Sequence, residues 1–213
     1  MHTSTHLLSV VVASLLSGGL LGATQLAPNH TIRFLLDYNQ APLGKTPDDI
    51  IPEVGKWKVV KAEGRRVLAQ EAQNPDKVFN VALIRRPHAR ELDLSVKLKA
   101  VAGKDDQGGG LIWRAKDKDN YYIARYNPLE DNFRVYKVER GKRTMFKNAD
   151  IPHTPGWHTL RVTMHGAHIE CFYDGKKYLE CDDTTFPDTG MIGLWSKADA
   201  QSYFDDLSLT RFE

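Results

Sequence analysis

The sequence predicts an all-β fold, an antiparallel sandwich or jelly roll of about a dozen strands. Apolar and polar residues alternate with a period of two over several runs, which places one face of each strand in a core. Turn signals rich in Gly, Asp and Asn separate these runs at intervals of roughly 8 to 12 residues. No segment carries the apolar stripe of an amphipathic helix.

Size and charge indicate one globular domain. The chain has 213 residues, of which 26% are charged and 41% hydrophobic, and its formal net charge is +2 at pH 7. A charge this small does not favour a nucleic-acid surface. We therefore expect a single domain over residues 24–213 and no nucleic-acid partner.

An apolar run from Leu7 to Leu21 dominates the first segment. Its length of about 15 residues suits a signal peptide better than a membrane span, which needs roughly 20. We predict a signal peptide over residues 1–23, export to the periplasm or the cell exterior, and no membrane span after cleavage. Because no Lys or Arg precedes the run, an uncleaved membrane anchor is the alternative.

The strands of the domain can be followed in chain order. Residues 32–36 are apolar and stand in a segment, 28–55, that is otherwise rich in Pro, Asp, Gly and Asn, which indicates a strand followed by a long surface loop. Residues 92–100 then alternate strictly, with an apolar side chain at every even position. Residues 157–166 repeat that pattern, so both runs are expected to cover a core with one face.

The stretch GGGLIWRAKDKDNYYIARYN, residues 108–127, holds two predicted strands rich in aromatic residues and arginine. An unpaired arginine in a core is costly, so Arg114 and Arg125 are placed on the outer face of these strands. Alternation then places Trp113, Tyr122 and Tyr126 in the core.

The same reasoning on residues 133–138 and 191–197 assembles one outer face from neighbouring strands. This face and its strand ends are expected to carry Arg114, Tyr121, Arg125, Asn127, Arg134, Tyr136, Trp195 and Lys197. Exposed rings beside fixed hydrogen-bond donors suit a sugar, whose C–H faces stack on rings while its hydroxyls accept hydrogen bonds. The alternatives are a cation-aromatic ladder that stabilises the sheet, or a face covered by residues 28–55.

A series of motifs resembles an exported bacterial branch of the 3-keto-disaccharide hydrolase-like domain family. The motifs are GGGLIWR, DNYYIARYNPLEDN, GKRT, GWHTLRV, DGKKYLECDDTTF, GLWSKADA and YFDDL, and the resemblance runs from about Trp57 to Thr210. It implies the concanavalin A-like jelly-roll fold and a carbohydrate or glycoside as partner. In the hydrolase branch the strand matching YYIARY carries an acidic or amide residue, whereas Tyr121, Ile123 and Arg125 occupy that face here.

The resemblance also implies a reaction. Members act on glycosides oxidised at the sugar 3-position, where a general base removes the C2 proton, the glycosidic oxygen leaves and water adds back. Glu130 and Asp199 are the candidate bases, and Arg114, Arg125 and Trp195 are the residues expected to hold the sugar. A salt bridge that fixes the loop is the alternative role for Glu130. A non-catalytic glycan-binding module and a laminin-G-like protein-interaction domain remain open as other functions.

No cofactor is expected, and the sequence contains no convincing metal site. His153, His158, His165 and His168 lie late in the chain without a Cys or carboxylate to complete a zinc set.

Two smaller features make structural predictions. Phe204, Leu207 and Leu209 can share one face only with a bulge near Asp205 and Asp206, where a structural Ca²⁺ ion is one hypothesis and hydrogen bonds to local backbone the other.

Cys171 and Cys181 flank a hairpin signal. A five-residue loop would bring them opposite each other for a disulfide, whereas a shorter loop leaves two free, buried thiols.

Overall fold

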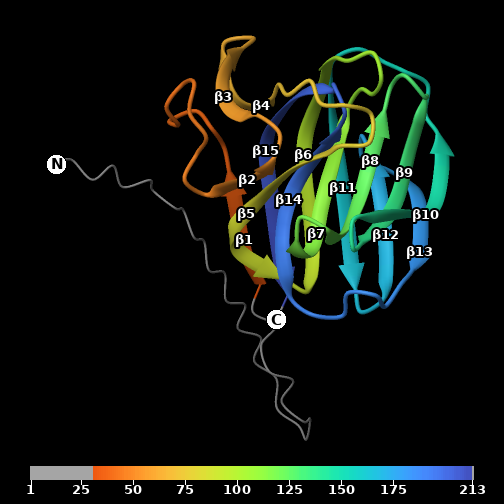
Figure 1. Ribbon diagram of the computed structural model, residues 1–213. Coiled ribbons are helices and arrows are strands. Elements are labelled where there is room, and N and C mark those ends of the chain that lie inside the picture. The colour runs from red at the N-terminus through yellow and green to blue at the C-terminus, as the bar shows by residue number, and fades with distance from the viewer. Residues whose placement is uncertain (1–30, 213) are drawn as a thin grey trace, which may run out of the picture.

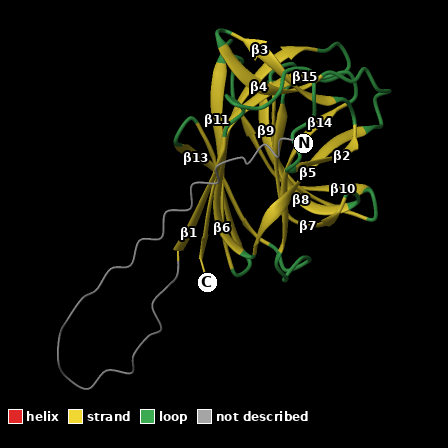
Figure 2. Cartoon of the chain, turned by 90° about the vertical axis from the view of Figure 1, so that its left-hand side faces the viewer, coloured by secondary structure: helices red, strands yellow, loops and turns green. Residues whose placement is uncertain are grey.

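The computed structural model describes residues 31–212 and is all-β (Figure 1). Two antiparallel sheets pack face to face, and the cartoon in Figure 2 contains only strands and loops. The predicted signal peptide, residues 1–23, lies outside the described residues. Within residues 31–212, no helix is long and apolar enough to cross a membrane.

Fifteen strands make up the two sheets. One sheet has eight strands in the order β13-β12-β11-β6-β15-β4-β3, with β1 also paired to β15, and the other has seven in the order β10-β9-β8-β7-β14-β5-β2. The strands are β1 Thr31–Leu36, β2 Ile50–Val54, β3 Trp57–Ala62, β4 Arg65–Gln70, β5 Phe79–Ala89, β6 Glu91–Ala102, β7 Gly109–Asp117, β8 Asn120–Asn127, β9 Asn132–Glu139, β10 Lys142–Asp150, β11 Trp157–His165, β12 His168–Tyr173, β13 Lys176–Asp182, β14 Gly190–Lys197 and β15 Gln201–Phe212. The predicted surface loop before residue 55 contains β2, which adds an edge strand to the seven-stranded sheet.

The last two strands lie inside the sheets. β14 pairs with β7 on one side and β5 on the other. β15 pairs along one side with β6, and along the other first with β4 and then with β1. The neighbour changes at Asp205 and Asp206, where the register with β6 shifts and Asp206 has a φ of 49°. The predicted bulge is therefore confirmed.

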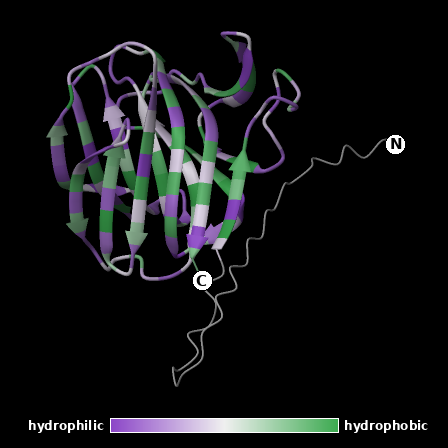
Figure 3. Ribbon diagram, turned by 180° about the vertical axis from the view of Figure 1, so that it is seen from behind, coloured by the Kyte–Doolittle hydropathy of each residue, from purple (hydrophilic) through white to green (hydrophobic). Residues whose placement is uncertain are grey.

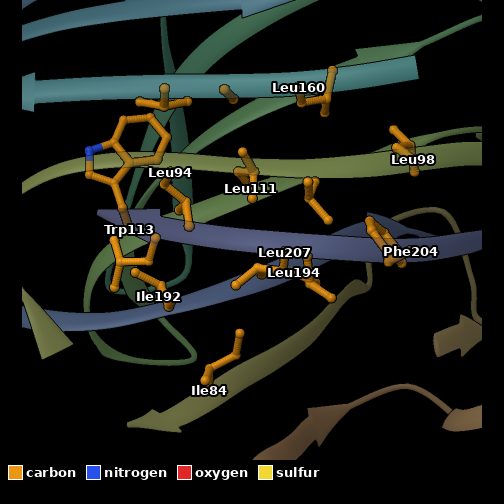
Figure 4. Close-up of a cluster of buried hydrophobic side chains, with 14 of the residues drawn as sticks. Ile84, Leu94, Leu98, Leu111, Trp113, Leu160, Ile192, Leu194, Phe204 and Leu207 are labelled. Carbon is orange, nitrogen blue, oxygen red and sulfur yellow. The ribbon is translucent and has the colours of Figure 1, made fainter. Parts of the chain in front are cut away.

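The core between the sheets follows the predicted alternation. Figure 3 shows strands banded with hydrophobic and hydrophilic residues, as expected for sheets with one buried face. Figure 4 shows side chains from both sheets meeting in this core, among them Trp113 and Leu160. The rings of Trp113 and Tyr122 stack with their centroids 5.6 Å apart, so these two residues are core residues, as predicted.

The bulge carboxylates have cationic partners. Arg65 lies 2.8 Å from an Asp205 oxygen and 3.1 Å from an Asp206 oxygen, and Lys97 lies 2.8 Å from the other Asp206 oxygen. A calcium site needs six to eight oxygen ligands, whereas these oxygens already face two cations. The residues present do not fit a calcium ion.

Both cysteines are free thiols. The hairpin between β12 and β13 turns over Asp174 and Gly175, the short-loop case, so Cys171 lies opposite Leu179 rather than Cys181. Burial raises the pKa of the Cys171 thiol and raises that of Cys181 to about 11.

Candidate functional site

The outer face of the seven-stranded sheet is a second hydrophobic cluster. Its buried residues are Val81, Leu83, Ile112, Ala115, Tyr121, Ile123, Tyr136, Val138 and Trp195. Alternation placed Tyr121, Tyr136 and Trp195 on the correct side of the sheet. The prediction that they are exposed is wrong, because Tyr121 and Trp195 are 0% exposed and Tyr136 is 4% exposed.

Arg143 of β10 covers part of this cluster. Its guanidinium carbon lies 4.5 Å from the Tyr136 ring centroid, 5.3 Å from that of Phe79 and 5.6 Å from that of Trp195. Such contacts favour a cation, and they help to explain why the rings are not solvated. Sequence reasoning missed Arg143, although alternation through the hairpin after β9 would have placed it opposite Val138 on this face.

Arg114 does not belong to this face. It lies at a register shift in β7 with a φ of 46°, so its side chain leaves the alternation. Its guanidinium is buried and donates hydrogen bonds to the carbonyl oxygens of Arg90 at 2.8 Å, Gly166 at 2.9 Å and Phe186 at 3.1 Å. The prediction of an outward-facing Arg114 is wrong because these three carbonyls satisfy it inside the protein.

Arg125 and Arg134 lie directly opposite each other on β8 and β9. Like charges in this position repel, but Glu130 in the connecting turn lies 3.2 Å from Arg125 Nη2 and 2.8 Å from Arg134 Nη1. Arg125 Nη1 also donates to the hydroxyl of Tyr136 at 3.2 Å. The structure therefore brings together four of the predicted site residues.

Asp106 is the centre of the charged group beside this arginine pair. Its carboxylate is buried and accepts a hydrogen bond from Asn127 Nδ2 at 3.0 Å, with Lys197 Nζ at 3.5 Å and Arg125 Nη2 at 3.8 Å. Burial raises its pKa above the ordinary value against the opposing effect of both cations. Sequence reasoning missed Asp106 because it lies in a loop, where no periodicity tells which side chain turns back to the sheet.

Asp199 fixes the loop that carries Asp106. Its carboxylate accepts hydrogen bonds from the backbone N–H groups of Lys104, Asp105 and Asp106 at 2.7, 3.1 and 3.1 Å. Burial acts to raise its pKa, but these N–H groups outweigh that effect and hold the pKa below the ordinary value. Through these contacts Asp199 is a positioning residue that holds the loop carrying Asp106.

The two predicted bases are weaker candidates than Asp106. Burial acts to raise the pKa of Glu130, but the Asn132 hydrogen bond and the Arg125 and Arg134 cations outweigh it, and the pKa lies below the ordinary value. A general base works best with a pKa near the working pH. Of these three acids, only Asp106 has its pKa shifted in that direction.

Three of the four histidines considered above lie beside carboxylates in the described part of the chain. His158 lies 2.8 Å from Asp174, His165 lies 3.7 Å from Glu91 and His168 lies 3.0 Å from Asp182. The expectation that no carboxylate accompanies the histidines is therefore wrong.

Only at His168, within the described residues, do three ligand-type side chains gather, with atoms of His168, Glu170 and Glu180 within 4.8 Å of one another. Lys177 Nζ bonds to both glutamates, at 2.8 and 2.5 Å. The two glutamates are therefore already paired with the exposed ammonium group of Lys177.

No protein-family model matches the chain, and no curated protein sequence matches it. Solved structures match its fold. The carbohydrate-binding module CBM66 from Bacillus subtilis has a TM-score of 0.65 at 17% identity, with 78% of this chain and 98% of that chain covered. The Crh5 transglycosylase, without ligand, has a TM-score of 0.59 at 12% identity, with 84% of each chain covered.

A mutant of the GH43 protein BlXynB from Bacillus licheniformis has a TM-score of 0.60 at 17% identity. The match covers 84% of this chain but 38% of that longer protein. At these identities the comparisons establish the fold, a jelly-roll sandwich that carbohydrate-binding modules and glycoside hydrolase-like proteins also have.

Proposed function

We propose that this protein is a carbohydrate-binding domain and that the sugar binds over Arg125, Arg134, Tyr136 and Lys197. The observation that carries the proposal is the cluster of hydrogen-bonding side chains on an otherwise apolar sheet face. We call this cluster the arginine site, with Asp106, Glu130, Asn127 and Arg143 as its other members. The folds of a carbohydrate-binding module and a transglycosylase support the same function.

The chemistry of the arginine site suits a saccharide. Guanidinium and ammonium groups donate to sugar oxygens, and the Asp106 and Glu130 carboxylates accept from sugar hydroxyls. The half-exposed members, Arg134 and Glu130, form a rim that a ligand reaches from solvent, with side chains 29% and 44% exposed. A few convergent polar groups over an apolar floor are typical of small-ligand sites.

A glycan panel tests the proposal. The purified protein is incubated with immobilised neutral and acidic oligosaccharides, and hits are measured by titration calorimetry. Arg134→Ala should weaken binding at least about tenfold, because a charge-assisted hydrogen bond contributes roughly 1.5 to 3 kcal/mol.

Arg161→Ala is the matched control, since Arg161 forms an exposed ion pair with Asp93 on the other sheet. Its binding should be unchanged. If no saccharide binds, or if both variants lose binding equally, the proposed site is wrong.

A second candidate function is hydrolysis of 3-keto-glycosides. The observation that favours it is Asp106, a buried carboxylate with a raised pKa beside two cations that would stabilise an enolate. The test is release of aglycone from 3-keto-glucosides. Asp106→Asn should abolish release, whereas Asp199→Ala should only weaken it, and turnover that survives in Asp106→Asn would contradict this role.

A further inference from the structure

We infer that the saccharide bound at the arginine site carries a carboxylate, as a uronic acid does, and that Arg125 and Arg143 receive it. The inference rests on the proposed function and narrows its ligand from saccharides in general to acidic ones.

The first observation is an unfilled pair of donors on Arg125. The side chain is 1% exposed, yet its Nε and Nη2 atoms have no hydrogen-bond partner within residues 31–212. These two nitrogens form one edge of the planar guanidinium, and their N–H groups point in parallel. A carboxylate fits such an edge with two parallel hydrogen bonds, whereas a sugar hydroxyl fills only one.

Arg143 adds a third donor to the same region. Its Nη1 atom is buried and also has no hydrogen-bond partner in the described chain. Burial lowers the pKa of Arg143 and the nearby Arg125 cation lowers it further, and both arginines help to hold the pKa of Glu130 below the ordinary value. Buried donors without acceptors are costly, which makes an incoming anion favourable.

The balance of charge at the arginine site also favours an anionic ligand. Arg125, Arg134 and Arg143 gather on one patch, and Glu130 is the acid that they share. Asp106, the next carboxylate, is itself shared with Lys197 and lies 3.8 Å from Arg125, beyond hydrogen-bond distance. The patch therefore has an excess of positive charge.

Glu130 shows how the ligand can enter. Its Oε2 atom lies 3.2 Å from Arg125 Nη2 without completing a hydrogen bond, and its side chain is 44% exposed in the turn before β9. A rotation of this side chain into solvent would leave room beside Arg125 for another carboxylate. Glu130 thus marks the position at which an acidic sugar would place its charge.

The experiment compares acidic oligosaccharides with neutral forms of the same backbone. Trimers of galacturonate, glucuronate and mannuronate, each also as the full methyl ester, are titrated into the protein by calorimetry. At least one acid form should bind on the order of 10- to 100-fold more tightly than its ester, the range expected for a charge-assisted pair of hydrogen bonds.

Variants connect that preference to the two arginines. Arg125→Lys keeps the charge but loses the parallel edge, so the preference for the acid should fall at least about tenfold. Because Arg125 is buried, its folding is checked by circular dichroism and melting. Arg143→Gln, at a half-exposed position, gives a second test with the same expected direction, and Lys142→Gln, its exposed neighbour, should retain the preference.

The outcomes separate the two proposals. Equal binding of acid and ester overturns the carboxylate inference but leaves carbohydrate binding intact. Tight binding of a neutral glycan, with no binding of any uronate trimer, also overturns the carboxylate inference alone. Failure of every saccharide, acidic or neutral, overturns the proposed function itself.

Discussion

Arg114 is a buried cation whose hydrogen-bond acceptors are neutral backbone carbonyls. It connects three segments that are distant in sequence through the carbonyl oxygens of residues 90, 166 and 186. The Glu91 carboxylate lies 3.5 Å from it and supplies some of the balancing charge. Removing the guanidinium leaves the buried Phe186 carbonyl and two partly buried carbonyls without their donor, and an unpaired buried acceptor costs more than the net value of its hydrogen bond.

We therefore predict that Arg114→Leu lowers the free energy of unfolding by about 3 kcal/mol. Urea denaturation measures the loss. The exposed Arg33→Leu is the control and should change stability by less than about 0.5 kcal/mol. Equal stabilities of the two variants would show that the buried hydrogen bonds contribute nothing net.

Trp195 is packed in the second hydrophobic cluster. Its ring contacts Phe79 at a centroid distance of 5.3 Å, and its Nε1 atom donates to the Tyr121 hydroxyl at 3.1 Å. Trp195→Ala should lower the free energy of unfolding by about 3 to 5 kcal/mol, the usual cost of deleting a buried aromatic side chain. A variant of wild-type stability that has lost sugar binding would instead support a direct role in stacking.

Asp106 makes a prediction about pH. Because burial raises its pKa, the folded protein holds this proton more tightly than the unfolded chain does. Stability contributed by the neutral acid is thus lost as pH rises above about 3.9, its ordinary pKa, through the raised value. Asn cannot ionise, so Asp106→Asn should become more stable relative to wild type across that window.

Urea denaturation from about pH 3 to about pH 8 follows the difference between the two proteins. Taking the difference removes the contributions of the other carboxylates. A difference that moves in wild type's favour with rising pH would mean that Asp106 gains from its cations more than it loses by burial.

At the scale of single strands, the turn between β12 and β13 decides the state of the cysteines. Its two-residue loop, together with a register shift between Cys171 and Phe172, puts Cys171 opposite Leu179 and Cys181 opposite Ile169. We predict that the protein has the same mass, after alkylation in denaturant, with and without prior reduction, with both thiols labelled. A product with no labelled thiol would require a different register in this hairpin.

The strands also show what periodicity can and cannot predict. Alternation assigned β8, β9 and β14 to the correct faces, because each keeps a regular pleat across the aromatic stretch. Alternation failed at Arg114, because the register of β7 shifts there and the side chain donates to three carbonyl oxygens inside the protein. A local pattern contains no information on those distant acceptors.

The candidate site was likewise predictable only where its residues lie on regular strands. Arg125, Arg134 and Tyr136 were found because they occupy strands. Asp106 and the covering role of Arg143 depend on a loop and on an edge strand that reach over the sheet. Alternation predicts on which face of a sheet a side chain lies, but it does not predict whether that face is exposed to solvent.

For the whole molecule, the central strands β14, β7 and β8 of the seven-stranded sheet are buried on both faces, whereas its edge strand β10 is largely exposed. Trp113 reports on the core between the sheets and Trp195 on the second cluster. Because strands β7 and β14, which carry these residues, pair directly, the two clusters should unfold together.

We predict that tryptophan fluorescence and far-ultraviolet circular dichroism give the same urea midpoint. Trp195→Phe removes the reporter of the second cluster and should leave the agreement intact. Separate midpoints in wild type that merge in this variant would show that the second cluster opens by itself.

The interior positions of β14 and β15 mean that neither sheet can be completed until these two strands have been synthesised. Both sheets receive a central strand from residues 190–212, which the ribosome makes after the other thirteen described strands. Until then β5, β6 and β7 each lack a neighbour, and their unpaired edges are open to other chains. A ribosome that stalls before residue 190 would therefore release a fragment prone to aggregation rather than a smaller folded protein.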